Sequence, residues 1–399
     1  MRFLFLLSMF SLNVFIVISA FLKQVMDIDI EPLYYPFIVV IALLNLCYFT
    51  YLLFVEKKVN KSFLLLFLFT FVLIVAFLSS GYNHTKIVQN NMLLYLIWSM
   101  PAALAGIYVA RIDKSIFEKF CKVIFYTFSI LLIMTILIPY LRGKLETPIS
   151  IGLMNYQNVS YIAAFTTGLG FYFTTASSIK HKLLYLIVSL LLIPIVVIAG
   201  GRGGAVVIII YFVITLINIY FNKKVHAFYK VLLLIGIIAS LIAFANLVTT
   251  IDKEGRLFSY ITDDGISLEE GSSGRDVVYK MDMNAISKKP VFGYGLFNYY
   301  QHTFGVPHNL ILEIILIGGY FLLILFIIFS IYLLVKYIRF YRKDKSDRLT
   351  LYIFVYPITL LMFSTNFLIV SEFWFFIFYI LSRNNKGYIN PNNKKIEEA

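Results

Sequence analysis

Long hydrophobic segments follow one another along almost the whole chain and are separated by short polar stretches. Most of these segments have the length that an α-helix needs, at about 1.5 Å per residue, to cross a hydrocarbon core of about 30 Å. The pattern therefore predicts an all-α integral membrane protein. About twelve transmembrane helices are expected, at residues 3–21, 34–55, 63–79, 91–109, 121–141, 151–173, 183–199, 204–221, 230–248, 309–335, 350–367 and 370–382.

The charged residues between the segments predict how these helices are oriented. The chain is 60% hydrophobic and only 14% charged, and Lys and Arg gather in every second connection. Connections rich in Lys and Arg lie in the cytoplasm, so we expect both termini there and an even number of spans. Twelve spans satisfy this condition, and ten would do so if two segments are re-entrant. The net charge of +13 is spread over short connections rather than one patch, so no nucleic-acid partner is expected.

One membrane domain accounts for nearly the whole chain. Residues 1–383 are expected to form a single polytopic domain, with one large extracytoplasmic loop at 249–308 between the ninth and tenth spans. The polar tail at 384–399 is expected to be disordered and cytoplasmic. The first segment could instead be a signal peptide, but its apolar run exceeds the length of about 7 to 15 residues that is usual for the hydrophobic part of such a peptide. Cys47 and Cys121 have no metal-ligand spacing, so no metal site is expected.

The second half of the large loop contains an expected amphipathic helix and a candidate anion site. The stretch SSGRDVVYKMDMNAISKKP begins with a capping box at Ser273 and Asp276 and ends before Pro290. Arg275 then projects from the first turn, where free backbone N–H groups and a planar guanidinium together suit a phosphate. The alternative is an arginine that is merely solvated.

A second candidate is the sequence AGGRGGA at 199–205, between the seventh and eighth expected spans. Its glycines let the backbone bend sharply or approach a ligand closely. Arg202 is the only charged residue for about 20 positions on either side, and a charge so isolated at a membrane surface usually has a partner. The alternative is a tight turn between helices, with the arginine reaching toward the surface.

The third candidate lies at the start of the tenth expected span, in VPHNLILEIILIGG at 307–319. His308 and Asn309 stand at the mouth of the helix and Glu313 lies about one turn deeper. A histidine with a pKa near 6.5 can take a proton from an attacking hydroxyl, which makes His308 the candidate general base. It could equally be a structural cap. An acidic residue inside a span is by default a functional candidate.

Polar side chains also occur inside the sixth expected span, in NYQNVSY at 155–161. The amides of Asn155, Gln157 and Asn158 could bind sugar hydroxyls. They could also hold helices together, since interhelical hydrogen bonds of this kind contribute about 0.6 to 2 kcal/mol each. Both interpretations remain open.

Taken in order, these motifs resemble the O-antigen polymerase and O-antigen ligase superfamily of bacterial surface-polysaccharide assembly. The resemblance rests on the glycine-flanked Arg202, on Arg275 followed by Y..D.NAI...P..GYG at 279–295, and on HNLILE at 308–313. It covers about residues 150 to 335. Gly201 stands where the family often has serine, and Tyr279 replaces an aliphatic residue or tryptophan, which bears on subfamily more than on fold.

The resemblance implies a membrane glycosyltransferase with a GT-C-like architecture in the bacterial cytoplasmic membrane. Such an enzyme takes a glycan from an undecaprenyl pyrophosphate carrier and transfers it at the extracytoplasmic face. Arg202 and Arg275 would hold the pyrophosphate and His308 would be the base, with Asn309, Glu313 and the three amides as further substrate contacts. Direct displacement would invert the anomeric centre. Neither a metal nor another cofactor is expected.

Two functions follow from this resemblance, and a third comes from a different class of protein. The favoured one is a repeat-unit polymerase of the Wzy type, whose acceptor is another lipid-linked repeat unit and whose partners include membrane lipids and a chain-length regulator. The second is a ligase that transfers the glycan to a lipid A core or a protein. The third is a flippase for lipid-linked oligosaccharide, which the clustering of the isolated charges at one membrane face disfavours.

Overall fold

The structure, a computed structural model, describes most of the chain: residues 2–56, 61–111, 114–176, 179–220, 275–303, 305–343 and 347–383, with short stretches between 230 and 266. Most of the expected ninth span at 230–248 lies outside the described residues. The same holds for the first half of the large loop, including Ser273, and for the tail at 384–399.

The regular secondary structure of the described residues is helical apart from two short antiparallel hairpins, and the prediction of an all-α membrane protein is confirmed. Strand β1 (Ser150–Ile151) pairs with β2 (Met154–Asn155), and β3 (Ile261–Thr262) pairs with β4 (Gly265–Ile266). Within the described ranges, seven helical segments are long and apolar enough to cross a membrane. The number twelve stays a prediction.

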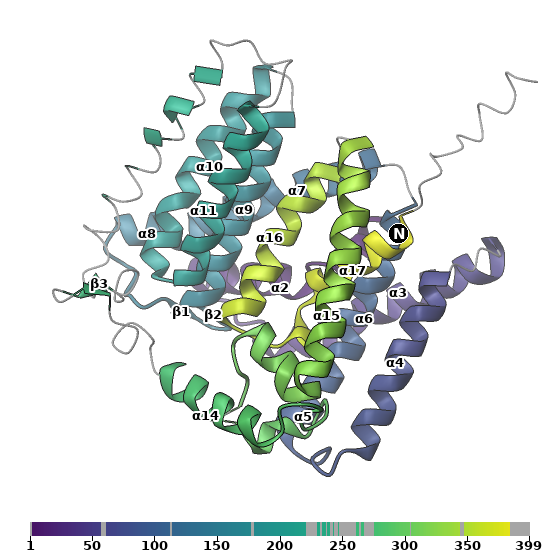
Figure 1. Ribbon diagram of the computed structural model, residues 1–399. Helices are drawn as coiled ribbons and strands as arrows, with labels where there is room; N and C mark the ends of the chain where they lie inside the picture. The colour runs from purple at the N-terminus through teal and green to yellow at the C-terminus, as the bar shows by residue number, and fades with distance from the viewer. Residues whose placement is uncertain are drawn as a thin grey trace, which may run out of the picture.

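The helices follow the hydrophobic segments closely (Figure 1). Their bounds are α1 Arg2–Leu7, α2 Ser11–Met26, α3 Tyr34–Glu56, α4 Lys61–Ser79, α5 Lys86–Leu94, α6 Met100–Val109, α7 Lys114–Leu132, α8 Ile138–Leu141, α9 Tyr156–Ala176, α10 Ile179–Ala199, α11 Arg202–Tyr220, α14 Arg275–Lys288, α15 Leu310–Lys343, α16 Asp347–Phe363 and α17 Ser371–Ser382. Single π-helical turns join α5 to α6 and α7 to α8.

Three expected spans differ in detail from the observed helices. The segment at 3–21 is divided into α1 and α2. The segment at 151–173 begins as a hairpin rather than a helix, because Gly152 adopts a turn conformation with φ +60° and the Asn155 side chain then caps α9. The segment at 309–335 contains a kink at Gly318–Gly319 inside α15. Gly319 has φ +65°, and a Cβ there would lie 2.1 Å from the Val291 carbonyl oxygen, so only glycine fits.

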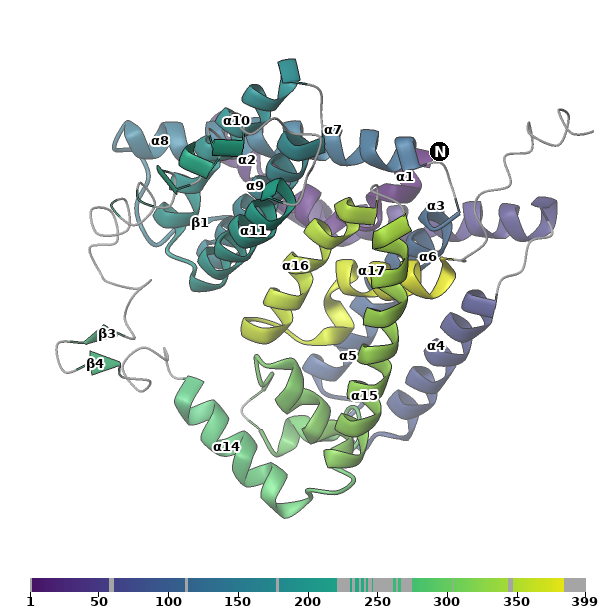
Figure 2. The same ribbon diagram turned by 45° about the horizontal axis from the view of Figure 1, so that its top comes forward.

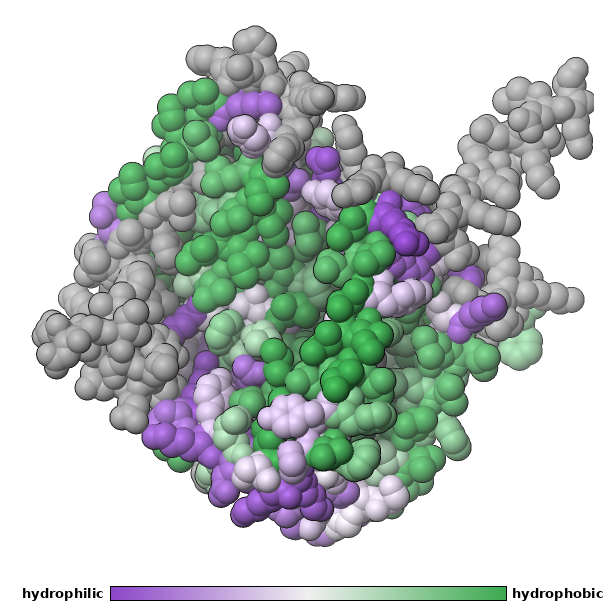
Figure 3. Space-filling model, viewed as in Figure 1, coloured by the Kyte–Doolittle hydropathy of each residue, from purple (hydrophilic) through white to green (hydrophobic). Residues whose placement is uncertain are grey.

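The interior and the lipid-facing surface are built from different helices. α9 is buried almost throughout and packs against α10, α11, α7 and α16, while α17 packs against α6. In contrast, α3, α4 and the long part of α15 expose mostly apolar side chains. Figure 3 shows this hydrophobic surface, with hydrophilic residues gathered at the lower end over α14. Exposed apolar helices of this length are expected in lipid, where hydrocarbon surrounds them.

α16 connects two chemically different ends of the molecule. It begins at Asp347, beside Lys114 at the start of α7, and it ends just before Ser364. α11 begins at Arg202, and the Asn218 side chain near its other end accepts a hydrogen bond from Tyr341. In both ribbon views the starts of α11 and α14 lie away from the Lys114 end (Figures 1 and 2).

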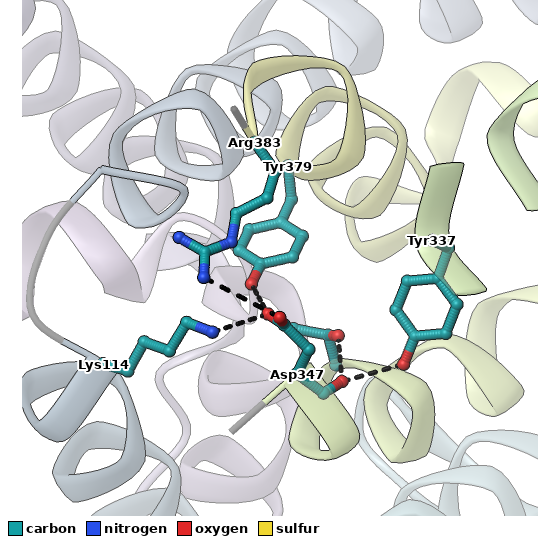
Figure 4. Close-up of polar contacts among 6 residues, drawn as sticks. Lys114, Tyr337, Asp347, Tyr379 and Arg383 are labelled. Carbon is teal, nitrogen blue, oxygen red and sulfur yellow. Dashed lines mark hydrogen bonds and ion pairs between the residues drawn. The ribbon is translucent and has the colours of Figure 1, made fainter. Parts of the chain in front are cut away.

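A buried carboxylate fixes four helices at the Lys114 end (Figure 4). Asp347 is fully buried, and its Oδ1 lies 2.8 Å from Lys114 Nζ and accepts a short hydrogen bond from Tyr379. Arg383 approaches Oδ2 at 3.8 Å, and Tyr337 donates to the Asp347 carbonyl oxygen. The cluster therefore ties α7, α15, α16 and the end of α17 together through charge neutralisation inside the protein.

We expect Asp347→Ala to destabilise the protein strongly. Removing one partner of a buried ion pair leaves uncompensated charge and costs about 3 to 5 kcal/mol. The matched control is Glu118→Ala, because Glu118 pairs with Lys122 on a half-exposed helix surface, where such a pair contributes about 0.5 kcal/mol or less. Thermal unfolding in detergent measures both. Equal melting temperatures for the two variants would contradict a stabilising role for the cluster.

Candidate active site

One cavity of about 510 Å³ brings together residues from five parts of the fold. Its walls come from the start of α9, the turn before α11, the start of α14, His308 just before α15 and Ser364 just after α16. Arg202, Arg275 and His308, the three residues predicted to carry the chemistry, all line it. Together they span more than 100 positions in the sequence, so only the tertiary structure brings them together.

Arg202 enters the cavity because α11 approaches α9 unusually closely. Gly200 takes the left-handed conformation with φ +68°, which turns the chain from α10 into α11. The Ser160 hydroxyl donates to the Gly201 carbonyl oxygen at 2.8 Å, and a Cβ on Gly204 would lie 2.6 Å from the Ser160 carbonyl oxygen. The glycines therefore do form a tight interhelical turn, and that turn is what aims Arg202 at the cavity.

Arg275 is the first residue of α14, and Val278 one turn later also lines the cavity. The rest of the helix is anchored away from it: Ala285 and Ile286 are buried and belong to a small cluster with Leu316 of α15. Packing at the C-terminal end of α14 thus holds its N-terminal end at the cavity. Arg275 as a whole is half-buried rather than fully exposed.

His308 stands in a constrained turn just before α15. Its backbone is left-handed with φ 54°, and its Nδ1 lies 2.9 Å from the Ser364 carbonyl oxygen. A carbonyl oxygen only accepts hydrogen bonds, so Nδ1 carries the proton and Nε2 keeps a free lone pair. Partial burial lowers the pKa of His308 from its ordinary value, the bond to Ser364 raises it, and the charge of Arg275 lowers it further.

Asn309 and Glu313, also predicted to contact substrate, do not line the cavity. The Asn309 side chain caps α15 by accepting from the backbone N–H groups of Ile311 and Leu312. Glu313 is fully buried; Tyr299 donates to its Oε1 at 2.8 Å and the Phe367 N–H donates to its Oε2 at 3.3 Å. The structure gives both residues partners within the protein.

The three amides near the start of α9 are divided in the same way. Gln157 lines the cavity, with its amide nitrogen donating to the Tyr156 hydroxyl. The Asn155 side chain accepts from the Asn158 N–H, and the Asn158 side chain donates to the Leu153 carbonyl oxygen. Only Gln157 of the three is placed to contact a ligand in this cavity.

Three polar residues of the cavity wall were not predicted from the sequence: Tyr156, Tyr161 and Ser364. Tyr161 shares a face of α9 with Gln157, and its hydroxyl accepts from Ser364 Oγ at 3.1 Å. The only signal for Tyr161 was its spacing of four residues from Gln157. Ser364 follows an apolar helix and belongs to no motif, so nothing in the sequence indicates that its carbonyl oxygen would orient His308.

The cavity is suited to an anion next to a base. Its lining contains two guanidiniums and a histidine but no carboxylate. Within the described part of the chain, no group of three or more His, Cys, Asp or Glu side chains could hold a metal ion. The two arginines bring positive charge to this cavity, and guanidiniums bind phosphate oxygens in a bidentate geometry.

The fold and the cavity define an all-α membrane protein with a polar, cationic site at one end of its helices. A family model described as O-antigen ligase matches residues 187–327, about a third of the chain, including Arg202, Arg275 and His308. This match confirms the resemblance seen in the motifs: residues 187–327 are similar to the O-antigen polymerase and ligase superfamily. The comparisons with curated proteins and with solved structures found no match.

The contacts of Glu313 predict a positioning role that can be separated from substrate binding. Glu313→Ala leaves the Tyr299 hydroxyl and the Phe367 N–H without their acceptor, and each buried unsatisfied group costs about 1 to 3 kcal/mol. We expect lower thermal stability and a lower kcat with little change in KM, and partial recovery in Glu313→Gln. The control is Glu146→Ala at an exposed position. A raised KM with unchanged stability would indicate a substrate contact instead.

Proposed function

We propose that this protein is a polysaccharide repeat-unit polymerase that transfers a growing glycan from undecaprenyl pyrophosphate to another lipid-linked repeat unit. The observation that carries the proposal is the convergence of Arg202, Arg275 and His308 on one cavity. The family match supports a polymerase or a ligase in general, and the geometry supports a transfer reaction with an anionic leaving group.

The reaction follows from the placement of these groups. Nε2 of His308 removes the proton from the acceptor hydroxyl, and the resulting oxygen attacks the anomeric carbon of the donor sugar. As that C–O bond forms, the bond between the anomeric carbon and the pyrophosphate oxygen breaks. The pyrophosphate leaves with the electron pair, and a single displacement of this kind inverts the anomeric centre.

The two arginines supply the charge stabilisation that the leaving group needs. Negative charge develops on the pyrophosphate in the transition state, and preorganised cationic donors are most effective where water is limited. Arg202 sits on a helix start fixed by close packing, and Arg275 on a helix start fixed by Ala285 and Ile286. The proposal is therefore a metal-independent inverting glycosyltransferase.

We place this site on the extracytoplasmic side of the bacterial cytoplasmic membrane, with both termini in the cytoplasm. Support comes from α16, whose Asp347 end lies among Lys114 and Arg383 while its other end reaches the cavity. Lys- and Arg-rich ends of membrane helices face the cytoplasm. Membrane lipids and a chain-length regulator protein remain the proposed partners.

A ligase is the second candidate, because the matching family model is described as O-antigen ligase. It would use the same donor and the same three residues but a lipid A core or a protein as acceptor. The two functions are separated by the acceptor alone. A flippase would require no base, and the orientation of His308 by Ser364 gives that reading no support.

We expect Arg202→Ala, Arg275→Ala and His308→Ala to abolish transfer, and Arg275→Lys to be impaired, since a point charge cannot replace the bidentate fork. The purified protein is incubated with an undecaprenyl pyrophosphate-linked repeat unit as sole substrate, and products are separated on a gel. Wild-type protein should give a ladder of lengthening glycans. Arg142→Ala, at an exposed arginine outside the cavity lining, is the matched control and should keep the ladder.

Each other outcome of this assay has a definite meaning. Transfer that occurs only after a lipid A core or a protein acceptor is added would establish the ligase. Lipid movement across vesicles without any longer glycan would establish a transporter. A normal ladder from all of the cavity variants would refute the site assignment.

The pH dependence of transfer should follow the protonation of His308. A base must be neutral to accept a proton, and a pKa below the ordinary value keeps His308 neutral at pH 7. We therefore expect the rate to be level around neutral pH and to fall only below about pH 6.5, the unperturbed histidine value. The prediction is checked by measuring the initial rate of transfer at a series of pH values between 5 and 8. A rate that already halves between pH 8 and 7 would contradict a lowered pKa.

A further inference from the structure

A second hollow lies on the other side of α15 from the cavity and differs from it completely in chemistry. It has a volume of about 490 Å³ and is walled by α4, by both parts of the kinked α15, and by α17. We call it the α4–α15 groove. All of its lining residues are apolar, and the one indole N–H, that of Trp374, is already used in a 2.7 Å hydrogen bond to the Phe367 carbonyl oxygen.

We propose that the α4–α15 groove holds the prenyl chain of the acceptor, the second lipid-linked repeat unit. This inference rests on the proposed function. The α4 wall runs from Leu65 to Ala76, the middle of a 19-residue candidate span, so the groove lies within the hydrocarbon depth of the membrane. A hollow with only apolar lining at that depth suits a hydrocarbon chain, because no polar group of the ligand would lack a partner.

The groove ends next to the proposed general base. Leu310 lines the groove and lies two residues after His308, while Phe367 lines it and lies three residues after Ser364. Ser364 is the residue whose carbonyl oxygen orients His308. A prenyl chain in the groove would therefore bring its polar head toward the turn that holds His308.

The stereochemistry of the proposed displacement favours this division of the two substrates. Inversion requires the acceptor oxygen and the leaving group to lie on opposite faces of the reacting sugar. Arg202 and Arg275, which would hold the leaving pyrophosphate, come from α11 and α14, and neither helix lines the groove. Figure 1 shows α11 and α14 on one side of α15 and α4 on the other. Donor and acceptor would thus approach from opposite sides.

The test fills the groove and compares two acceptors. Ala76→Trp and Leu325→Trp place an indole in the groove, while Val75→Trp and Ile324→Trp place it on neighbouring lipid-facing positions outside the lining. With saturating preassembled donor, we expect both groove variants to raise KM about tenfold for a repeat unit on a full-length polyprenyl chain, a loss of about 1.4 kcal/mol of binding. For the same repeat unit on a short prenyl chain KM should not change.

The controls and the competing outcomes separate this inference from the proposed function. Val75→Trp and Ile324→Trp should behave as wild type with both acceptors. An unchanged KM for the full-length acceptor in both groove variants would overturn the inference, as would an equal loss with both acceptors. Failure of wild-type protein to extend either acceptor would instead count against the polymerase function itself.

A direct binding measurement completes the test without relying on turnover. A photo-crosslinking amino acid at position 76 should capture the polyprenyl-linked repeat unit in wild-type background, and excess unlabelled compound should suppress the product. The same group at position 75 serves as the control. Capture of phospholipid alone, unaffected by the polyprenyl compound, would show that the groove binds bulk lipid and would overturn the inference.

Discussion

The site depends on one constraint of the membrane interior: a polypeptide that leaves its helix there must find hydrogen-bond partners inside the protein. The chain does so between α16 and α17, where Asn366, Leu368 and Val370 are buried outside any α-helix. Glu313 accepts the Phe367 N–H, Asn91 pairs with Asn366, and Ser99 donates to the Leu368 carbonyl oxygen. Since the same segment begins at Ser364, the network that satisfies it also fixes the partner of His308.

The Asp347 cluster holds the other end of the same helices. α16 is tied at its start by Lys114 and Arg383 and at its end through Ser364, which contacts both Tyr161 and His308. α17 returns from the buried break to the Asp347 end in 12 residues, about 18 Å of helix. Because both ends of the pair are fixed by buried polar contacts, the Ser364 carbonyl oxygen that orients His308, the proposed base, belongs to a firmly held unit.

Hydropathy predicted the helices well because lipid requires long apolar segments. An isolated charge pointed to Arg202, because a charge near hydrocarbon is costly, and positions at helix starts pointed to Arg275 and His308. The sequence could not show what the Glu313 carboxylate contacts. An acidic residue in an apolar segment stands out in the sequence whether its carboxylate faces a ligand or, as here, Tyr299 and a backbone N–H. The kink in α15 and the role of the Ser364 carbonyl depend on contacts between distant segments, which no local pattern records.

Arg202 and Arg275 are brought to the cavity in a different way from His308. Arg202 precedes the large loop and Arg275 follows it, so their convergence requires α14 to return to the start of α11. Two like charges lining one cavity without a carboxylate repel each other. A pyrophosphate bound between the two arginines would replace their repulsion by attraction to the shared anion. A ligand that binds one arrangement of a protein more tightly also stabilises that arrangement. A pyrophosphate donor, if it binds there, would therefore stabilise the arrangement in which the starts of α14 and α11 line one cavity. His308, held by an uncharged contact to Ser364, does not depend on that neutralisation.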